Sequence, residues 1–128
     1  MTPMRRALHA SLASLLPMTA GAQDIGLASG LAARLDEVIW DEADGPWLRL
    51  RFVAPGMAAA APETLATDME TLCSEVGLPI LAAGGGEVER IVVSISERPV
   101  PFGTSDPATA QVFDMFRPEH GACIWEPF

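Results

Sequence analysis

The chain has 128 residues, 49% of them hydrophobic, and a formal net charge of −9 without a single lysine. A chain of this length forms one domain with one modest core. So acidic a chain repels phosphate backbones and anionic lipid headgroups. Composition therefore argues against binding to nucleic acids or to membrane surfaces.

Residues 1–22 have the three-part layout of a secretory signal peptide. Arg5 and Arg6 give a positive start, a mostly apolar run covers 7–16, and small residues stand at 20–22. The apolar run is far shorter than the roughly 20 residues that a helix needs to span a bilayer. We therefore expect export rather than membrane insertion, by general secretion or by the twin-arginine route.

Cleavage is expected between Ala22 and Gln23, which makes the protein periplasmic or secreted. Two of the eight arginines precede this cut and all 17 acidic residues follow it, so the processed chain would carry a net charge of −11. Residues 23–34 are rich in small side chains and are expected to form a flexible lead-in. A single α+β domain is expected over 35–128.

The first part of this domain is expected to form a β-hairpin. Two β-rich runs flank residues 43–46, which have the composition of a turn. In the second run Leu48, Leu50 and Phe52 alternate with Arg49 and Arg51, as in a strand with one buried and one wet face. We expect the two arginines to pair with nearby acidic residues, although they could also grip an anionic ligand.

The clearest predicted helix begins at Pro62, a residue suited to the first helical turn. Gly77 is expected to cap its end and Pro79 to prevent the helix from resuming. Asp68 is expected on the polar side of this helix. The apolar stripe on the other side consists of Leu65, Met69, Leu72, Cys73 and Val76.

A strand is predicted over 91–96, because apolar residues alternate there and the prolines that follow cannot donate to a ladder. A second short helix is predicted next. Ser105 or Asp106 would cap it, Pro107 would open it and Pro118 would end it. Its inward residues would be Val112, Phe113 and Phe116, and a short strand would follow over 121–128.

The predicted order is therefore β-β-α-β-α-β. Strands separated by helices favour an α+β fold, here a small mixed sheet covered on one face by two helices.

The two cysteines are expected to form one disulfide. Cys73 lies on the apolar stripe of the helix and Cys123 on the terminal strand. A pair of cysteines in an oxidising compartment usually forms a bridge. Free buried thiols and a catalytic thiol remain alternatives, the latter with His120 as its base. His120 is the only histidine after the predicted cut, and we expect it in a solvated turn.

No catalytic residue is predicted, and no metal or cofactor, because no known ligand or cofactor motif is present. The alternative is a small hydrolase or thiol-redox enzyme that uses His120 with Cys123 or with Asp114. Along an extended strand, however, a three-residue offset places His120 and Cys123 on opposite faces.

The candidate binding residues are Arg98, Pro99, Pro101 and Phe102. Stiff loops with proline and aromatic residues often serve as contact surfaces. The alternative is structural: the prolines end the strand and protect a sheet edge, and Phe102 packs into the core.

Four segments, "LRFVAP", "DMETLC", "IVVSISERPVPFG" and "GACIWEPF", give the chain a resemblance to a known group of sequences. Together they resemble a family of small exported alphaproteobacterial proteins of unknown function. The resemblance implies periplasmic residence and implies Cys73 and Cys123 as bridge partners. It implies no activity. We therefore expect a soluble periplasmic protein with a binding or accessory role, whose partner is an unidentified protein or small molecule of the envelope.

Overall fold

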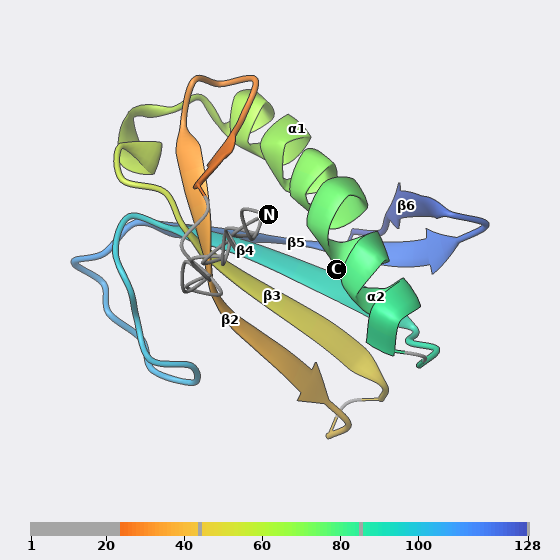
Figure 1. Cartoon of the computed structure of the whole chain (residues 1–128). Helices are drawn as coiled ribbons and strands as arrows, with labels where there is room; N and C mark the ends of the chain where they lie inside the picture. Colours follow the sequence, from red (N-terminus) through yellow and green to blue (C-terminus); the bar gives the residue numbers. More distant parts are fainter. Residues whose placement is uncertain (1–23, 44, 85, 128) are drawn as a thin grey trace, which may run out of the picture.

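The structure is a computed structural model and describes residues 24–43, 45–84 and 86–127. The predicted signal peptide and its cleavage site lie outside these residues. The described chain is an α+β half-barrel, in which a curled sheet of six strands packs on one long helix (Figure 1). The strands are β1 Asp24–Gly26, β2 Ala32–Asp41, β3 Trp47–Val53, β4 Arg90–Ser96, β5 Gln111–Glu119 and β6 Ala122–Trp125.

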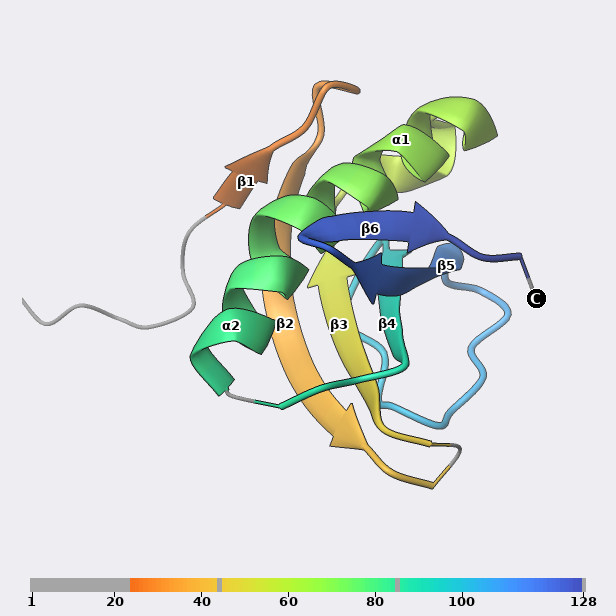
Figure 2. The ribbon, with the colours of Figure 1, turned by 90° about the vertical axis from the view of Figure 1, so that its right-hand side faces the viewer.

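Each strand of the sheet lies next to its neighbour in sequence, in the order β1-β2-β3-β4-β5-β6. All pairs are antiparallel except β3 with β4, which run parallel. A parallel pair needs a long crossover connection, and the helix supplies it. The helix lies on one face of the sheet, between β1 and β6 (Figure 2).

The helix runs without a break over 23 residues, as α1 Pro62–Leu72, a π turn at Cys73–Gly77 and α2 Leu78–Gly84. The predicted end at Gly77 and Pro79 is wrong. In the π turn the Leu78 amide donates to the Cys73 carbonyl, five residues back. A proline ring normally collides with the carbonyl four residues before it, and the wider turn accommodates Pro79. A single 3₁₀ turn, η1 Met57–Ala59, precedes the helix.

Gly77 serves packing rather than capping. A Cβ atom on this residue would lie 3.1 Å from Cδ1 of Leu50 and 3.4 Å from Cγ2 of Ile91. The helix therefore approaches β3 and β4 so closely that a larger residue at this position would have to push Leu50 aside.

The predicted second helix is wrong: its residues from Gln111 onward form β5, so the described order is β-β-β-α-β-β-β with one helix. The Asp-Pro pair that suggested a helix start forms a turn instead. The Asp106 carboxylate accepts from the Ala108 amide at 3.0 Å, and the Asp106 carbonyl accepts from the Thr109 amide at 3.0 Å. The same aspartate geometry can cap a helix or close a turn.

Pro118 does not interrupt β5, because the missing amide hydrogen is not needed there. Pairing between β4 and β5 ends at Phe116. Beyond that point β5 pairs only with β6. The Met115 carbonyl accepts from the Glu126 amide on the β6 side. Because the backbone groups of successive residues face alternate sides of a strand, Pro118 faces the β4 side, where β5 has no partner strand.

The sheet begins earlier than expected, because β1 and the first residues of β2 lie inside the segment 23–34. The hairpin of β2 and β3, the strand β4 and the final strand β6 agree with prediction.

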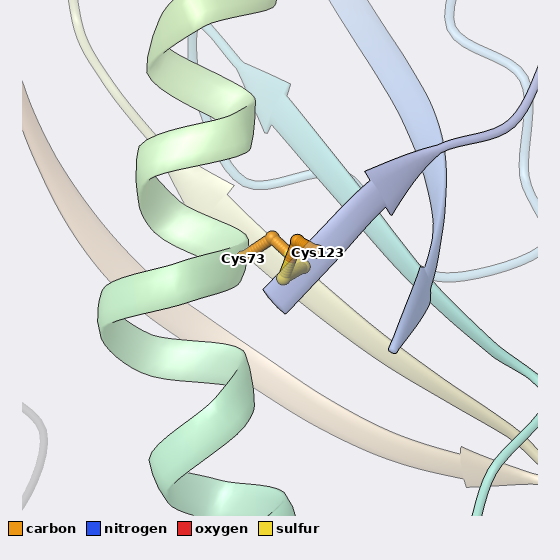
Figure 3. The surroundings of a disulfide bond; sticks show 2 residues. All are labelled: Cys73 and Cys123. Carbon is orange, nitrogen blue, oxygen red and sulfur yellow. A yellow bond between two sulfur atoms is a disulfide. The ribbon is translucent and has the colours of Figure 1, made fainter. Parts of the chain in front are cut away.

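The core fills the space between helix and sheet. It is built from large, fully buried side chains of both layers, among them Leu48, Leu50, Phe52, Met57, Leu72, Ile91, Val93, Ile95 and Phe116. The predicted disulfide is confirmed: Cys73 of the helix is bonded to Cys123 of β6, with 6.3 Å between their Cα atoms (Figure 3).

Asp68 is buried, contrary to the expectation that it lies on the polar side of the helix. Its side chain is 0% exposed. Oδ1 accepts a long hydrogen bond from the Ser29 amide at 3.4 Å, and Oδ2 has no partner among the described residues. A buried polar atom without a partner costs stability.

Candidate ligand cleft on the open face of the sheet

The sheet has a second face, opposite the helix, which we call the open face. Because side chains alternate along a strand, each of β3, β4 and β5 sends every second residue to it. The strand register aligns these residues in rows, one of which joins Arg49, Val92 and Met115. The residues of this face that matter below are Trp47, Arg49 and Arg51 on β3, Val92 and Ser94 on β4, and Gln111 and Phe113 on β5.

The open face is hollowed along β4, because the side chains of this strand are smaller than those beside them. Ser94 stands between Arg51 of β3 and Phe113 of β5 in the register. The result is a cleft of about 310 Å³. It is lined by Trp47, Arg49, Leu50, Arg51, Val92, Ser94, Phe102, Gly103, Thr104, Gln111 and Phe113.

One wall of the cleft is completed by the loop 97–110, which connects β4 to β5 and lies on the opposite side of the sheet from the helix (Figure 1 and Figure 2). Phe102 of this loop packs against both arginines of β3. Its ring centroid is 5.4 Å from Cζ of Arg49 and 5.5 Å from Cζ of Arg51. Arg49 also lies 5.1 Å from the ring of Trp47. These contacts are cation–π interactions.

Both arginines are held by acidic partners from β2, which confirms the predicted salt bridges. Nε of Arg49 donates to Asp41 at 2.9 Å, and Nη1 of Arg51 donates to Glu37 at 2.9 Å. The Ala43 amide and then Arg49 donate to the Asp41 carboxylate and lower its pKa. The guanidinium groups are therefore fixed in place with their charges offset.

The loop is fastened to the sheet at several points. Nη2 of Arg51 donates to the Val100 carbonyl at 2.7 Å. Glu97 accepts from the amides of Gly56 and Ala58 at 2.7 and 3.0 Å, and these two bonds lower its pKa. The wall that carries Phe102 is thus tied both to β3 and to the turn before the helix.

The loop is also braced from within by Arg98. This residue donates to Thr109 at 2.7 Å and to Asp106 at 3.2 Å. Hydrogen bonds from Thr109, the Ala108 amide and Arg98, in that order of effect, lower the pKa of Asp106.

The four predicted binding residues do not converge on one site. Phe102 lies in the cleft and is 50% exposed, so it is not part of the core. Arg98 and Pro99 line a different groove of about 450 Å³, which also contains Arg34 and Glu97. Pro101 is exposed on the loop.

The sequence reasoning missed most of the cleft. Phe113 was expected to face inward from a helix, but it is 57% exposed on the open face. Trp47, Ser94 and Gln111 were not considered. The signal that could have found Trp47 is the alternation of β3, because residues 47, 49 and 51 occupy the phase opposite to the buried residues 48 and 50. Ser94 is buried like the rest of β4 and gives no such signal.

The alternative site at His120 and Cys123 is not supported. The sulfur of Cys123 is bonded to Cys73, so it is not a free nucleophile. The His120 side chain is 93% exposed. With Gly121 it forms the β5–β6 turn, in which both residues have positive φ, 49° and 74°. Such a two-residue turn joins antiparallel strands. Within the described ranges, no group of three or more histidine, cysteine or acidic side chains could hold a metal ion.

The fold and the cleft define a small α+β half-barrel with an aromatic-lined hollow on its open sheet face. Over residues 10–128 the chain matches the family described as a "Family of unknown function (DUF6497)", and it belongs to that family. The expected kinship with a family of unknown function is confirmed at this level. No curated protein and no solved structure matches the chain. None of the helices in the described part of the chain is long and apolar enough to cross a membrane.

Proposed function

We propose that the protein is exported, cleaved between Ala22 and Gln23, and acts in the periplasm or outside the cell as a binding or accessory protein. In this proposal the cleft on the open face is its ligand site. Export is supported by the disulfide between Cys73 and Cys123, because such bonds form and persist in oxidising compartments.

The observation that carries the binding role is the exposure of two phenylalanine rings around a hollow floor. Phe102 and Phe113 are 50% and 57% exposed, and both line the cleft above Ser94. Concave sites with aromatic walls and a few polar groups are the usual form of small-molecule sites. Large exposed apolar side chains that gather in one place mark interaction sites.

The chemistry of the lining favours binding over catalysis. Among the described residues that line the cleft there is no histidine, cysteine or carboxylate, the side chains that most often transfer protons in enzymes. What the cleft offers is flat aromatic surface, fixed guanidinium groups, and hydrogen bonds from Ser94 and Gln111.

The binding role is tested by screening a library of small fragments against the processed protein with two-dimensional NMR. We expect binders to shift the indole resonance of Trp47. Ser94→Leu fills the floor of the cleft and should weaken those binders at least about tenfold. The matched control is Ser74→Leu on the exposed side of the helix, which should leave binding unchanged. Shifts confined to other surfaces, or full binding by a folded Ser94→Leu variant, would refute the cleft as the ligand site.

Export is tested separately by the intact mass of the protein recovered from its native host. We expect a chain that begins at Gln23 and is lighter than the reduced form by the two hydrogens lost on oxidation. A full-length chain recovered from the cytoplasm with both thiols reduced would overturn the export proposal and leave the cleft to be judged on its own test.

A further inference from the structure

The charges around the cleft are balanced within the protein. Arg49 and Arg51 each lie 2.9 Å from a carboxylate of β2, and Arg51 also donates to the Val100 carbonyl. An incoming anion would have to compete with these carboxylates. It would also approach a processed protein whose formal net charge would be −11, from six arginines and 17 acidic residues, which repels it at long range.

A cation is equally ill suited to the cleft. Two guanidinium groups stand in one wall, with Cζ atoms 5.4 and 5.5 Å from the centroid of the Phe102 ring. A positive ligand placed against that ring would therefore meet two like charges at close range, and like charges brought together at an interface are unfavourable.

The surfaces that remain for a ligand are flat. The ring of Phe102 packs on the arginines of β3, whereas Phe113 stands on β5, across β4 from them. The ring of Trp47 lies beside Arg49. Aromatic rings pair best with other aromatic rings, in offset or edge-to-face arrangements, and guanidinium planes stack on them as well. A flat ring therefore makes better contacts here than a puckered aliphatic one.

The polar groups of the floor are few and uncharged. Ser94 offers a hydroxyl and Gln111 an amide, and both line the same cleft as the rings. The volume of the cleft, about 310 Å³, is at the lower end of the range for small-molecule sites. The space thus suits one small ring with a hydrogen-bonding substituent.

We infer that the ligand of the cleft is a small, uncharged aromatic molecule that carries a hydrogen-bonding group, of which a phenol is the simplest example. This inference rests on the proposed binding function and names its ligand class. The aromatic ring lies between Phe102 and Phe113, and its polar group meets Ser94 or Gln111.

Four probes of matched size and different chemistry test this ligand class on the processed, oxidised protein. They are p-cresol, 4-methylbenzoate, 4-methylbenzylammonium and 4-methylcyclohexanol, each titrated by NMR or calorimetry. We expect p-cresol to bind at least about tenfold more tightly than each of the other three. Ser94→Leu should remove p-cresol binding. Phe113→Leu should reduce the preference for p-cresol over 4-methylcyclohexanol while leaving the protein folded.

Four outcomes would overturn the inference. Tighter binding of 4-methylbenzoate than of p-cresol would show that the arginines still attract an anion. Tighter binding of 4-methylbenzylammonium would show that they do not repel a cation. Equal binding of 4-methylcyclohexanol would show that the cleft does not distinguish a flat ring from a puckered one. Acetyl-Gly-Tyr-Gly-amide carries the same ring as p-cresol, and binding more than about tenfold tighter than p-cresol would assign the cleft to a partner protein's side chain. In each of these cases the cleft still binds, so the proposed function survives. If neither the four probes nor any fragment binds there, both proposals fail.

Discussion

Reduction of the disulfide is expected to cost the protein a large part of its stability. The bond joins Cys73 in the middle of the helix to Cys123 on the last strand, across 50 positions of sequence. Both residues are buried, with exposures of 0% and 8%. The link therefore closes a loop that contains the second half of the helix, β4 and β5.

The size of the effect follows from loop closure in the unfolded chain. For a loop of this length, the chain-entropy relation gives about 4 kcal/mol at 25 °C. A domain of this size has a total free energy of unfolding of about 5 to 15 kcal/mol. The reduced protein is therefore expected to be marginal or unfolded at physiological temperature.

Urea denaturation of the oxidised and the reduced protein measures the contribution of the disulfide directly, because the two forms have the same sequence and differ only in this bond. The reduced form should also show a larger dependence of unfolding free energy on urea, since its unfolded state is more expanded. The double variant Cys73→Ala with Cys123→Ala serves as a second reduced state. A difference below about 1 kcal/mol between the two redox forms, with unchanged urea dependence, would refute the loop-closure reasoning.

Three further predictions concern single residues. Gly77→Ala places a Cβ atom 3.1 Å from Leu50 Cδ1. This change should lower the free energy of unfolding by about 1 kcal/mol, although alanine has the higher helix propensity. A raised melting temperature would contradict this prediction. Asp68→Leu replaces a fully buried carboxylate by an apolar side chain of the same shape, and should stabilise by about 1 to 3 kcal/mol. Loss of stability in urea would show that the hydrogen bond from the Ser29 amide outweighs the cost of burying the carboxylate. Glu97 has a pKa below its ordinary value of 4.5 because two backbone amides donate to it, so its contribution is present above pH 4.5 and is lost as pH falls through the lower, folded-state pKa. Glu97→Gln should therefore lower the melting temperature at pH 7, and the difference in melting temperature from the wild type should vanish in acid. A difference that does not change with pH would show that the charge of the Glu97 carboxylate does not cause it.

The strands that could be predicted are those whose alternation is strict. In β3 the buried residues Leu48 and Leu50 alternate with Arg49 and Arg51, and only a strand explains that pattern. β5 has no such signal, because polar and apolar residues occur on both of its faces. Its aspartate-proline start has the same local chemistry as a helix cap, so the choice between helix and strand depended on tertiary pairing with β4 and β6.

The length of the helix could not be predicted from the glycine and proline residues within it. Glycine and proline usually end a helix, but here Gly77 makes room for the sheet and a π turn makes room for Pro79. Both are consequences of packing between layers, which single-sequence patterns do not contain. The disulfide was predictable because only two cysteines are present and each lies on an apolar position.

The candidate site was predictable only in part. Phe102 was singled out from its loop composition, and it does line the cleft. The hollow itself depends on Ser94 being smaller than its neighbours across the sheet, Arg51 and Phe113. That relation exists only once the register is known, so no local motif could have revealed it.

The consecutive order of the six strands means that most of the sheet forms between neighbours in sequence. In a chain that emerges amino end first, β1, β2 and β3 can pair as soon as they appear, since each waits only for a short turn. The parallel partner β4 arrives only after the whole helix has been made, and Cys123 arrives last of all. The disulfide therefore ties the middle of the helix to the last strand, and it can form only when the helix and the β5–β6 hairpin lie side by side.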